Sequence, residues 1–284
     1  MDSDASPDLA KTRAAIDAID GELLRLIEAR AALAQAVRDA KAGAQPAKPR
    51  WICPEREANI LRRLAAERQG RFPLPALMQI WHELIGGMIR LEHSVRLAVS
   101  EPLAGLARAA FGAVAQVDTQ ASAQQVLFAV RAETADAGLV PWPEAEENSP
   151  WWRNMLEVSG SLQVSAALPF LRPEYSKPSA VFLAAQPAFP SGDDMQLLAA
   201  RRTAPASRSA LALLVQTIDP EWGEIIALHG EWALLQMQFI ESEQDDRLAQ
   251  LCSAQGPFDR VRPLGLYPRP LTYNPDNPDA SSVW

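Results

Sequence analysis

The sequence contains little cysteine, little histidine and no long apolar run. Two cysteines in 284 residues, Cys53 and Cys252, are too few for a disulfide scaffold and fit a reducing cytoplasm. The three histidines, His82, His93 and His229, show no metal-ligand spacing, and we therefore expect no metal site. No window approaches the eighteen apolar residues of a membrane span, and the acidic N-terminus lacks the features of a secretory signal. We expect a cytoplasmic protein that does not contact membranes.

An excess of basic charge is also missing. The formal net charge is -8, which argues against a nucleic-acid or anionic-membrane partner. Hydrophobic residues make up 48% of the chain, which excludes general disorder. The length of 284 residues allows two or three small domains.

Apolar residues recur three and four positions apart near the N-terminus, which predicts one amphipathic helix over 7–42, roughly 50 Å long. They are Leu9, Ile16, Ile19, Leu23, Leu26, Ile27, Leu33 and Val37. Two shorter helices are expected over 54–70 and 73–93. Two short helices cannot cover so long a stripe, so residues 1–95 predict an all-α, three-helix domain in an intertwined dimer.

Cations lie close to this apolar stripe. The eleven steps from Arg30 to Lys41 return the helix to within about 20° of the same face, whereas Arg13 points roughly 100° away. Two cations directed into an apolar seam are costly unless they meet anions, which favours a pocket for a small polycarboxylate. In the alternative, each cation reaches solvent or pairs with a nearby glutamate.

Two segments carry a family resemblance. Leu9 to Lys41 resembles the first helix of the all-helical chorismate mutases, L-R-x-x-I-D-x-I-D-x-x-L-L-x-L-L-x-x-R followed by a lysine eleven residues later. P-E-R-E-A-N-I-L, from Pro54 to Leu61, resembles the second-helix motif D-P-x-R-E-x-x-V/I-L. The resemblance ends near Val95 and implies a homodimer in which each pocket receives an arginine from the partner chain.

The resemblance also implies a role for each charged residue. Arg30, together with Arg13 of the partner subunit, would hold the two carboxylates of chorismate. Lys41 would donate to the ether oxygen, Glu57 would bind the ring hydroxyl, and Arg56 would support the pocket wall. The pericyclic rearrangement to prephenate needs no cofactor, and we expect none.

Three further pocket positions depart from the common family pattern. Cys53 stands where the family often has Asp, and it is a poor helix cap. Met88 and Glu92 stand where Ser and Gln are common. An ionised Glu92 would repel the developing ether anion, so we expect burial to raise its pKa and keep it protonated. In the alternative, Glu92 is a solvated residue at a helix end.

Residues 96–190 predict an α/β lobe. Val95 to Gly112 is expected as strand, turn and helix, and Gln124 to Glu144 as helix, turn and buried strand. This order resembles the first lobe of prephenate dehydratase, which follows the mutase in bifunctional enzymes. Ser100 to Leu103 replaces its Gly-rich loop, and Ala180-Val181-Phe182 replaces its T-R-F motif. We therefore expect a degenerate lobe that does not dehydrate prephenate.

Residues 191–271 predict an α+β unit of order β-α-β-β-α-β. Strands are expected at 195–202, 225–228, 232–240 and 261–267, with helices at 207–218 and 241–252. The order resembles an ACT-type regulatory domain, which binds an aromatic amino acid in the dehydratase family. Its E-S-R-P signature is absent, with His229-Gly230-Glu231 nearest, so structural packing is the alternative. The tail, 272–284, is expected to be loop or disorder.

The leading interpretation is a chorismate mutase, an isomerase of aromatic amino-acid biosynthesis in the shikimate pathway. A non-catalytic mutase fold, used for dimerisation and ligand sensing, is the alternative. A full bifunctional enzyme is disfavoured, because the dehydratase residues are missing.

Overall fold

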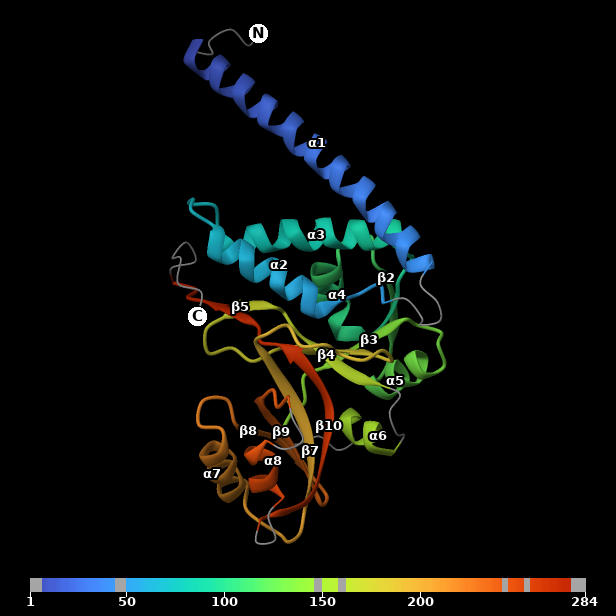
Figure 1. The fold of residues 1–284 in the computed structure, drawn as a ribbon, viewed down its shortest axis with the longest axis vertical. Coiled ribbons are helices and arrows are strands. Elements are labelled where there is room, and N and C mark those ends of the chain that lie inside the picture. Colours follow the sequence, from blue (N-terminus) through green and yellow to red (C-terminus); the bar gives the residue numbers. More distant parts are fainter. Residues whose placement is uncertain are drawn as a thin grey trace.

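A computed structural model describes residues 7–43, 50–145, 150–157, 162–241, 245–252 and 256–276. Three helices form one end of the molecule, and an α/β region built on a large sheet forms the rest (Figure 1). The predicted fold class, an all-α segment followed by an α/β region, is confirmed.

The helical segment contains α1 (Pro7–Gly43), α2 (Pro54–Glu67) and α3 (Leu74–Glu92), within three residues of the predicted bounds. Proline begins α2, where its missing N–H costs nothing. Cys53 precedes it and, as expected, its side chain forms no capping hydrogen bond.

Helix α1 leaves the remainder of the chain and crosses α3 only near its own C-terminal end (Figure 1). Ala34 is buried there. The predicted apolar stripe is uncovered, with Ile19 60% exposed and Leu33 68% exposed. Within the described residues, a single chain therefore does not bury the face that makes α1 amphipathic.

Helices α2 and α3 are anchored on the α/β region. Leu61 of α2 and Leu74 of α3 are fully buried in a cluster that includes Phe170 and Leu271. The guanidinium of Arg62 donates to the backbone carbonyl of Asp193 at 2.6 Å and to the Ser191 hydroxyl at 2.8 Å. These two helices thus belong to the folded body, whereas α1 does not.

Nine strands form one sheet in the order β2-β1-β3-β6-β4-β10-β7-β9-β8, and β11 and β5 form a separate pair. The bounds are β1 (Arg96–Ser100), β2 (Gln116–Gln120), β3 (Ala137–Pro141), β4 (Gln163–Leu168), β5 (Leu171–Pro173), β6 (Ala180–Ala184), β7 (Asp194–Arg202), β8 (Glu224–His229), β9 (Trp232–Gln238), β10 (Phe258–Pro268) and β11 (Leu271–Tyr273). Strands β2, β1 and β3 run parallel, and most other neighbours are antiparallel.

Helices cover both faces of the sheet. They are α4 (Ala104–Phe111), α5 (Ala123–Arg131), α6 (Trp151–Glu157), α7 (Arg208–Ile218) and α8 (Asp246–Leu251), with a 3-10 turn η1 (Glu101–Leu103). Because strand side chains alternate, Val181 of β6 joins the core under α5 and α6, whereas Phe182 joins the core under α4. Leu198 of β7 likewise contributes to the core under α7 and α8.

Strands β4 and β10 connect the two parts of the sheet through a single parallel pairing of Gly265 with Val164. Gly265 has φ +140°, and a Cβ there would lie 2.2 Å from the Val164 carbonyl oxygen. Only glycine fits this position without displacing backbone.

The secondary structure of the body was partly predicted. The expected order over 95–112 and 124–144 is confirmed by β1, η1, α4, α5 and β3. The order of the last unit is confirmed by β7, α7, β8, β9, α8 and β10, although α8 begins at Asp246 rather than near 241. Strands β2, β4, β5, β6 and β11 were not predicted.

The tail prediction is wrong for its first residues. Thr272 and Tyr273 belong to β11 and pair in parallel with Arg172 and Pro173 of β5. Leu271 at the start of β11 is buried in the cluster beneath α2 and α3, which holds the strand in place. Residues 277–284 lie outside the described part of the chain.

Candidate functional site

Arg30 and Arg56 are the two predicted site residues that the structure brings together. Arg30 lies on α1, and its Nη1 donates to the Leu84 carbonyl of α3 at 3.3 Å. Burial lowers the pKa of Arg30, and the positive charge of Arg56 lowers it further. In the described residues no carboxylate forms an ion pair with either guanidinium. Two neighbouring cations without a counter-ion favour an anionic ligand.

Two other predicted cations are not part of this arrangement in one chain. Arg13 is exposed on α1, seventeen residues before Arg30 and therefore about 25 Å away along the helix. Lys41 lies within α1, but its side chain is outside the described residues. The same chain therefore cannot place Arg13 beside Arg30.

Glu57 lies on the side of α2 that faces the body. It lines a small cavity together with His82 of α3, Phe111 of α4 and Phe170. Burial raises the pKa of Glu57 to about 7, although the Cys53 backbone N–H donates to its carboxylate and acts in the opposite direction. A carboxyl group with this pKa is about half protonated near neutral pH, so it can donate as well as accept a hydrogen bond.

The three unusual pocket positions occupy different environments. Cys53 is half-buried, with its thiol 3.9 Å from the Arg50 carbonyl oxygen. Met88 is buried within α3, and Glu92 is partly exposed in the last turn of the same helix. The expected protonation of Glu92 stays a prediction.

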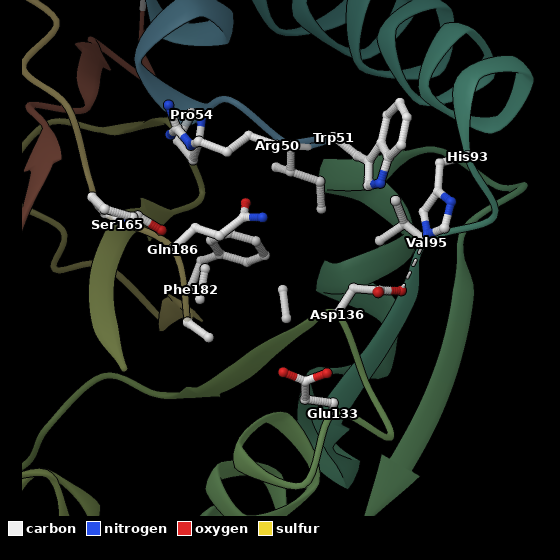
Figure 2. Close-up of a pocket in the computed structure, with 15 residues that line it drawn as sticks. Arg50, Trp51, Pro54, His93, Val95, Glu133, Asp136, Ser165, Phe182 and Gln186 are labelled. Atoms are coloured by element: carbon white, nitrogen blue, oxygen red, sulfur yellow. Dashed lines mark ion pairs between the residues drawn. The ribbon is translucent and has the colours of Figure 1, made fainter. Parts of the chain in front are cut away.

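A larger cavity of about 410 Å³ lies where the helical segment meets the sheet (Figure 2). The Trp51 and His93 rings stack with centroids 4.9 Å apart, and His93 Nε2 lies 3.8 Å from an Asp136 carboxylate oxygen. Ser165 is buried, and its hydroxyl has no hydrogen-bond partner among the described residues. Arg50 at the rim forms a bidentate pair with Glu55, at 2.9 and 3.0 Å.

Sequence reasoning missed this cavity. The available signal was an apolar pair, Trp51 and Ile52, directly before a helix, which is unusual for a solvated loop. Ser165 lies in β4 and Asp136 lies directly before β3, and no local pattern joins them.

No group of three or more His, Cys, Asp or Glu residues suited to a metal occurs in the parts of the chain described above. None of the described helices is long and apolar enough to span a membrane.

Comparison with known proteins decides the family of the helical segment. Residues 12–93 match the family model for chorismate mutase type II. The helical segment is similar to this family over these residues. The match begins one residue before Arg13 and ends at His93, so it includes Arg13, Arg30, Lys41 and the Arg56-Glu57 pair. That resemblance is confirmed.

A bifunctional chorismate mutase/prephenate dehydratase from Aquifex aeolicus (strain VF5) is 32% identical over 142 residues, which cover 47% of this chain. The chain spans 38% of the length of that relative. The similarity supports the predicted order, a mutase segment followed by a dehydratase-like region.

Solved structures resemble the α/β region only distantly. A structure described as GqqA, a novel type of quorum-quenching acylase, covers 62% of this chain at 16% identity and a TM-score of 0.43; 95% of that chain is covered. Prephenate dehydratase from Arthrobacter aurescens, in complex with L-Phe, covers 62% at 12% identity and a TM-score of 0.40, with 90% of its own chain covered. Prephenate dehydratase from Streptococcus mutans covers 61% of this chain at 16% identity and a TM-score of 0.39, and 97% of its own chain is covered.

Proposed function

We propose that this protein is a chorismate mutase, an isomerase that converts chorismate to prephenate in aromatic amino-acid biosynthesis. The observation that carries the proposal is the half-buried Arg30, which feels the positive charge of Arg56 and has no ion-pair partner among the described residues, within a segment that matches the chorismate mutase type II family. Chorismate has two carboxylates, which are the groups that such a cluster binds. We place the reaction in the cytoplasm, where the two free cysteines remain reduced.

We propose that the functional unit is a homodimer. The exposed stripe of α1 supports this, because each leucine or isoleucine that a second copy covers contributes about 1.5–3 kcal/mol. In such a dimer, Arg13 of the partner subunit joins Arg30 on the substrate carboxylates. The distance of about 25 Å between these residues in one chain is the reason that a partner is required.

The reaction breaks a C–O bond and forms a C–C bond in one cyclic shift, without a nucleophile. The protein holds the reactive diaxial conformer and stabilises negative charge on the ether oxygen. In our proposal Lys41 donates to that oxygen, and Glu57 binds the ring hydroxyl. The raised pKa of Glu57 supports this role, because a neutral carboxyl adds no negative charge to the site.

The remaining pocket positions have supporting roles in the proposal. Arg56 adds positive charge beside Arg30. Cys53 and Met88 form an apolar wall of the proposed substrate pocket. In the proposal the Glu92 side chain donates a hydrogen bond near the ether oxygen. Glu92→Gln keeps a donor at this position and should retain activity, and a loss of activity in that variant would remove this role of Glu92.

The remainder of the chain is proposed to be a dehydratase-like lobe over 96–190 and an ACT-like unit over 191–271, without dehydratase activity. Strand β6 carries Ala180-Val181-Phe182 where the dehydratase has T-R-F, so the hydroxyl and the cation for dehydration are missing.

The test is the loss of chorismate absorbance with the purified full chain, followed by acid treatment, which converts prephenate to phenylpyruvate. Phenylpyruvate that forms only after acid is the expected result. Phenylpyruvate without acid would show an active dehydratase. No loss of chorismate between about pH 5 and 8 would refute the mutase and favour the non-catalytic, ligand-sensing alternative.

A further inference from the structure

The cavity in Figure 2 has no role in the proposed mutase reaction. Its volume of about 410 Å³ suits a small molecule, and none of the predicted mutase residues lines it. Val95 and Asp136 line it directly before β1 and β3, so it lies at the N-terminal edge of these parallel strands. Ser100 to Leu103, which stand in place of the dehydratase loop, follow β1 at the opposite edge. The cavity is therefore separate from both regions that carry a family resemblance.

Ser165 is the first indication of a ligand in this cavity. Where β4 pairs with β6, β4 has one extra residue between Val164 and Ala166, so Ser165 occupies a β-bulge. Its hydroxyl points into the cavity, on the side that Gln186 also lines (Figure 2). Ser165 is 5% exposed, and the hydroxyl has no hydrogen-bond partner among the described residues. A buried hydroxyl without a partner is costly, and a polar group of a ligand would remove that cost.

Asp136 carries a charge that its neighbours do not fully neutralise. Its Oδ2 accepts a hydrogen bond from the Arg96 backbone N–H at 2.8 Å. The cationic groups that face it are farther away, with Arg96 Nε at 3.9 Å and His93 Nε2 at 3.8 Å, both beyond hydrogen-bond range. Within the described residues Oδ1 accepts no hydrogen bond. A carboxylate in this state favours a cationic ligand.

The other charged groups of the lining do not favour an anion. Arg50 is held by Glu55 in a bidentate pair, at 2.9 and 3.0 Å, and its guanidinium carbon lies 4.6 Å from the Phe189 ring centroid. Glu133 places a second carboxylate on the same side of the cavity as Asp136 (Figure 2). Glu133 has φ +56°, a conformation that is uncommon for a residue with a side chain and that occurs often at functional sites.

The cavity beside Arg172, of about 560 Å³, has a different distribution of charge. Arg172 and Lys177 line it together with Glu174 and Glu224, and Glu224 pairs with Lys177 at 2.7 Å. Its lining has two groups of each sign and therefore does not select the charge of a ligand. In the cavity of Figure 2 carboxylates predominate, because the one arginine of the lining is already paired.

Aromatic rings line the space between Asp136 and Ser165. The Trp51 ring stacks on His93, with centroids 4.9 Å and planes 12° apart, which holds the indole at the cavity. Phe182 of β6 is buried beneath the same space, and Asp136 and Ser165 lie on opposite sides of it (Figure 2). Aromatic walls favour a flat ring, and an indole also attracts a cation.

We propose that this cavity binds a small organic ammonium ion that has one ring and a polar group at its opposite end. The ammonium group binds at Asp136 and Glu133. The ring lies against Trp51 and Phe182, and the polar group forms a hydrogen bond with the Ser165 hydroxyl. The lining residues come from one chain, so binding does not require a dimer.

The test uses isothermal titration calorimetry of the purified full chain with tyramine as the probe, at up to about 10 mM. Tyramine is expected to bind one site per chain. The acid 3-(4-hydroxyphenyl)propionate, which has a carboxylate in place of the ammonium group, is expected not to bind. Asp136→Asn keeps an acceptor for the Arg96 N–H and removes the charge, so it should weaken tyramine binding at least about tenfold. Asp118→Asn, the same change at an exposed position of β2, is the matched control.

Phenethylamine, which differs from tyramine only in lacking the hydroxyl, tests the contact to Ser165. The wild type is expected to prefer tyramine about fivefold, which corresponds to one hydrogen bond. Ser165→Ala should remove this preference and leave the affinity for phenethylamine unchanged. The preference is a ratio within one protein, so a partial folding defect does not alter it.

Four results would overturn the proposal. They are absence of tyramine binding to the wild type, binding of the acid as tight as that of tyramine, unchanged tyramine affinity in Asp136→Asn, and an undiminished preference for tyramine in Ser165→Ala. The first two use the wild type alone, so they do not depend on whether a variant folds.

Discussion

Helix α1 and strand β7 differ in whether their apolar residues are buried within one chain. In β7 the first seven residues are all buried, and the two neighbouring strands and the helices on the sheet cover them within one chain. In α1 nine large apolar residues remain exposed, from Ile27 at 38% to Leu33 at 68%. Within the described residues the body covers its apolar strands in one copy, whereas the apolar stripe of α1 is left uncovered.

The comparison assigns the two regions different tasks. A body that needs no second chain can hold a ligand cavity of its own. In the proposed dimer the cations of the helical segment are used between chains, because Arg13 lies about 25 Å from Arg30 along α1. Loss of the proposed dimer should therefore abolish mutase activity and leave ligand binding by the body unchanged.

The largest expected effect breaks the assembly. Leu23→Glu places a charge in the α1 stripe, and in a twofold dimer the change occurs twice. We expect dimerisation to weaken at least about 10³-fold, because burying an unpaired carboxylate costs several kcal/mol. Sedimentation equilibrium measures this. Ala32→Glu is the control, because it is nine residues away and points about 180° from Leu23. A dimer that survives Leu23→Glu would show that the stripe is not the interface.

Removing a substrate cation is expected to have the next largest effect. Arg30→Ala should reduce kcat/KM by about 10²–10³-fold, or about 3–4 kcal/mol, and leave the dimer intact. The absorbance assay for chorismate measures it. Arg63→Ala on the exposed face of α2 should change little. Equal losses in both variants would indicate a general defect of the helices rather than a lost contact to a carboxylate.

The third prediction concerns the stability of the α/β body, at the point where β10 pairs with β4. Gly265→Ala should lower the free energy of unfolding by about 2–4 kcal/mol, because the new Cβ meets the Val164 carbonyl. Urea unfolding followed by tryptophan fluorescence measures this. Gly192→Ala is the matched control, since φ is also positive there but no atom lies within 4 Å of the added carbon. Similar losses in both variants would attribute the effect to backbone strain alone.

The sequence predicted elements whose pattern is local. Helix α1 has a stripe of period 3.6, and β7 contains the apolar run from Leu197 to Ala200, so both were identified. Strand β2 (Gln116–Gln120) was missed because it is polar and largely exposed at the edge of the sheet. Strands β5 and β11 have three residues each, too few to show any period.

The sites show the same limit. Arg30 was found because it belongs to a motif within one helix, and Arg56 because it belongs to a motif at the start of another. Arg172 lies in the three-residue strand β5, Leu-Arg-Pro. Whether a carboxylate forms an ion pair with Arg172 depends on which residues, distant in sequence, approach it in the folded chain. Only the folded chain shows that Glu224 is paired with Lys177 and is thus unavailable to Arg172.

The smallest expected effect concerns Glu57, where the helical segment meets the body. The pKa of Glu57 is about 7 in the folded chain and 4.5 in the reference state, so the folded state binds more protons between these values. The free energy of unfolding should therefore fall as pH rises from about 4.5 through 7. Because the Glu57 side chain is partly exposed, we expect the free energy of unfolding to fall by only about 1–2 kcal/mol.

Glu57→Gln should abolish that loss, and Glu67→Gln, at the exposed end of α2, should retain it. Urea unfolding at about pH 5 and pH 8 measures both. The wild-type slope also contains His82, whose pKa burial lowers, so stability lost through His82 appears as pH falls instead. The difference between Glu57→Gln and the wild type isolates Glu57. An identical pH dependence in the two proteins would mean that Glu57 faces water in the folded chain and that burial does not raise its pKa.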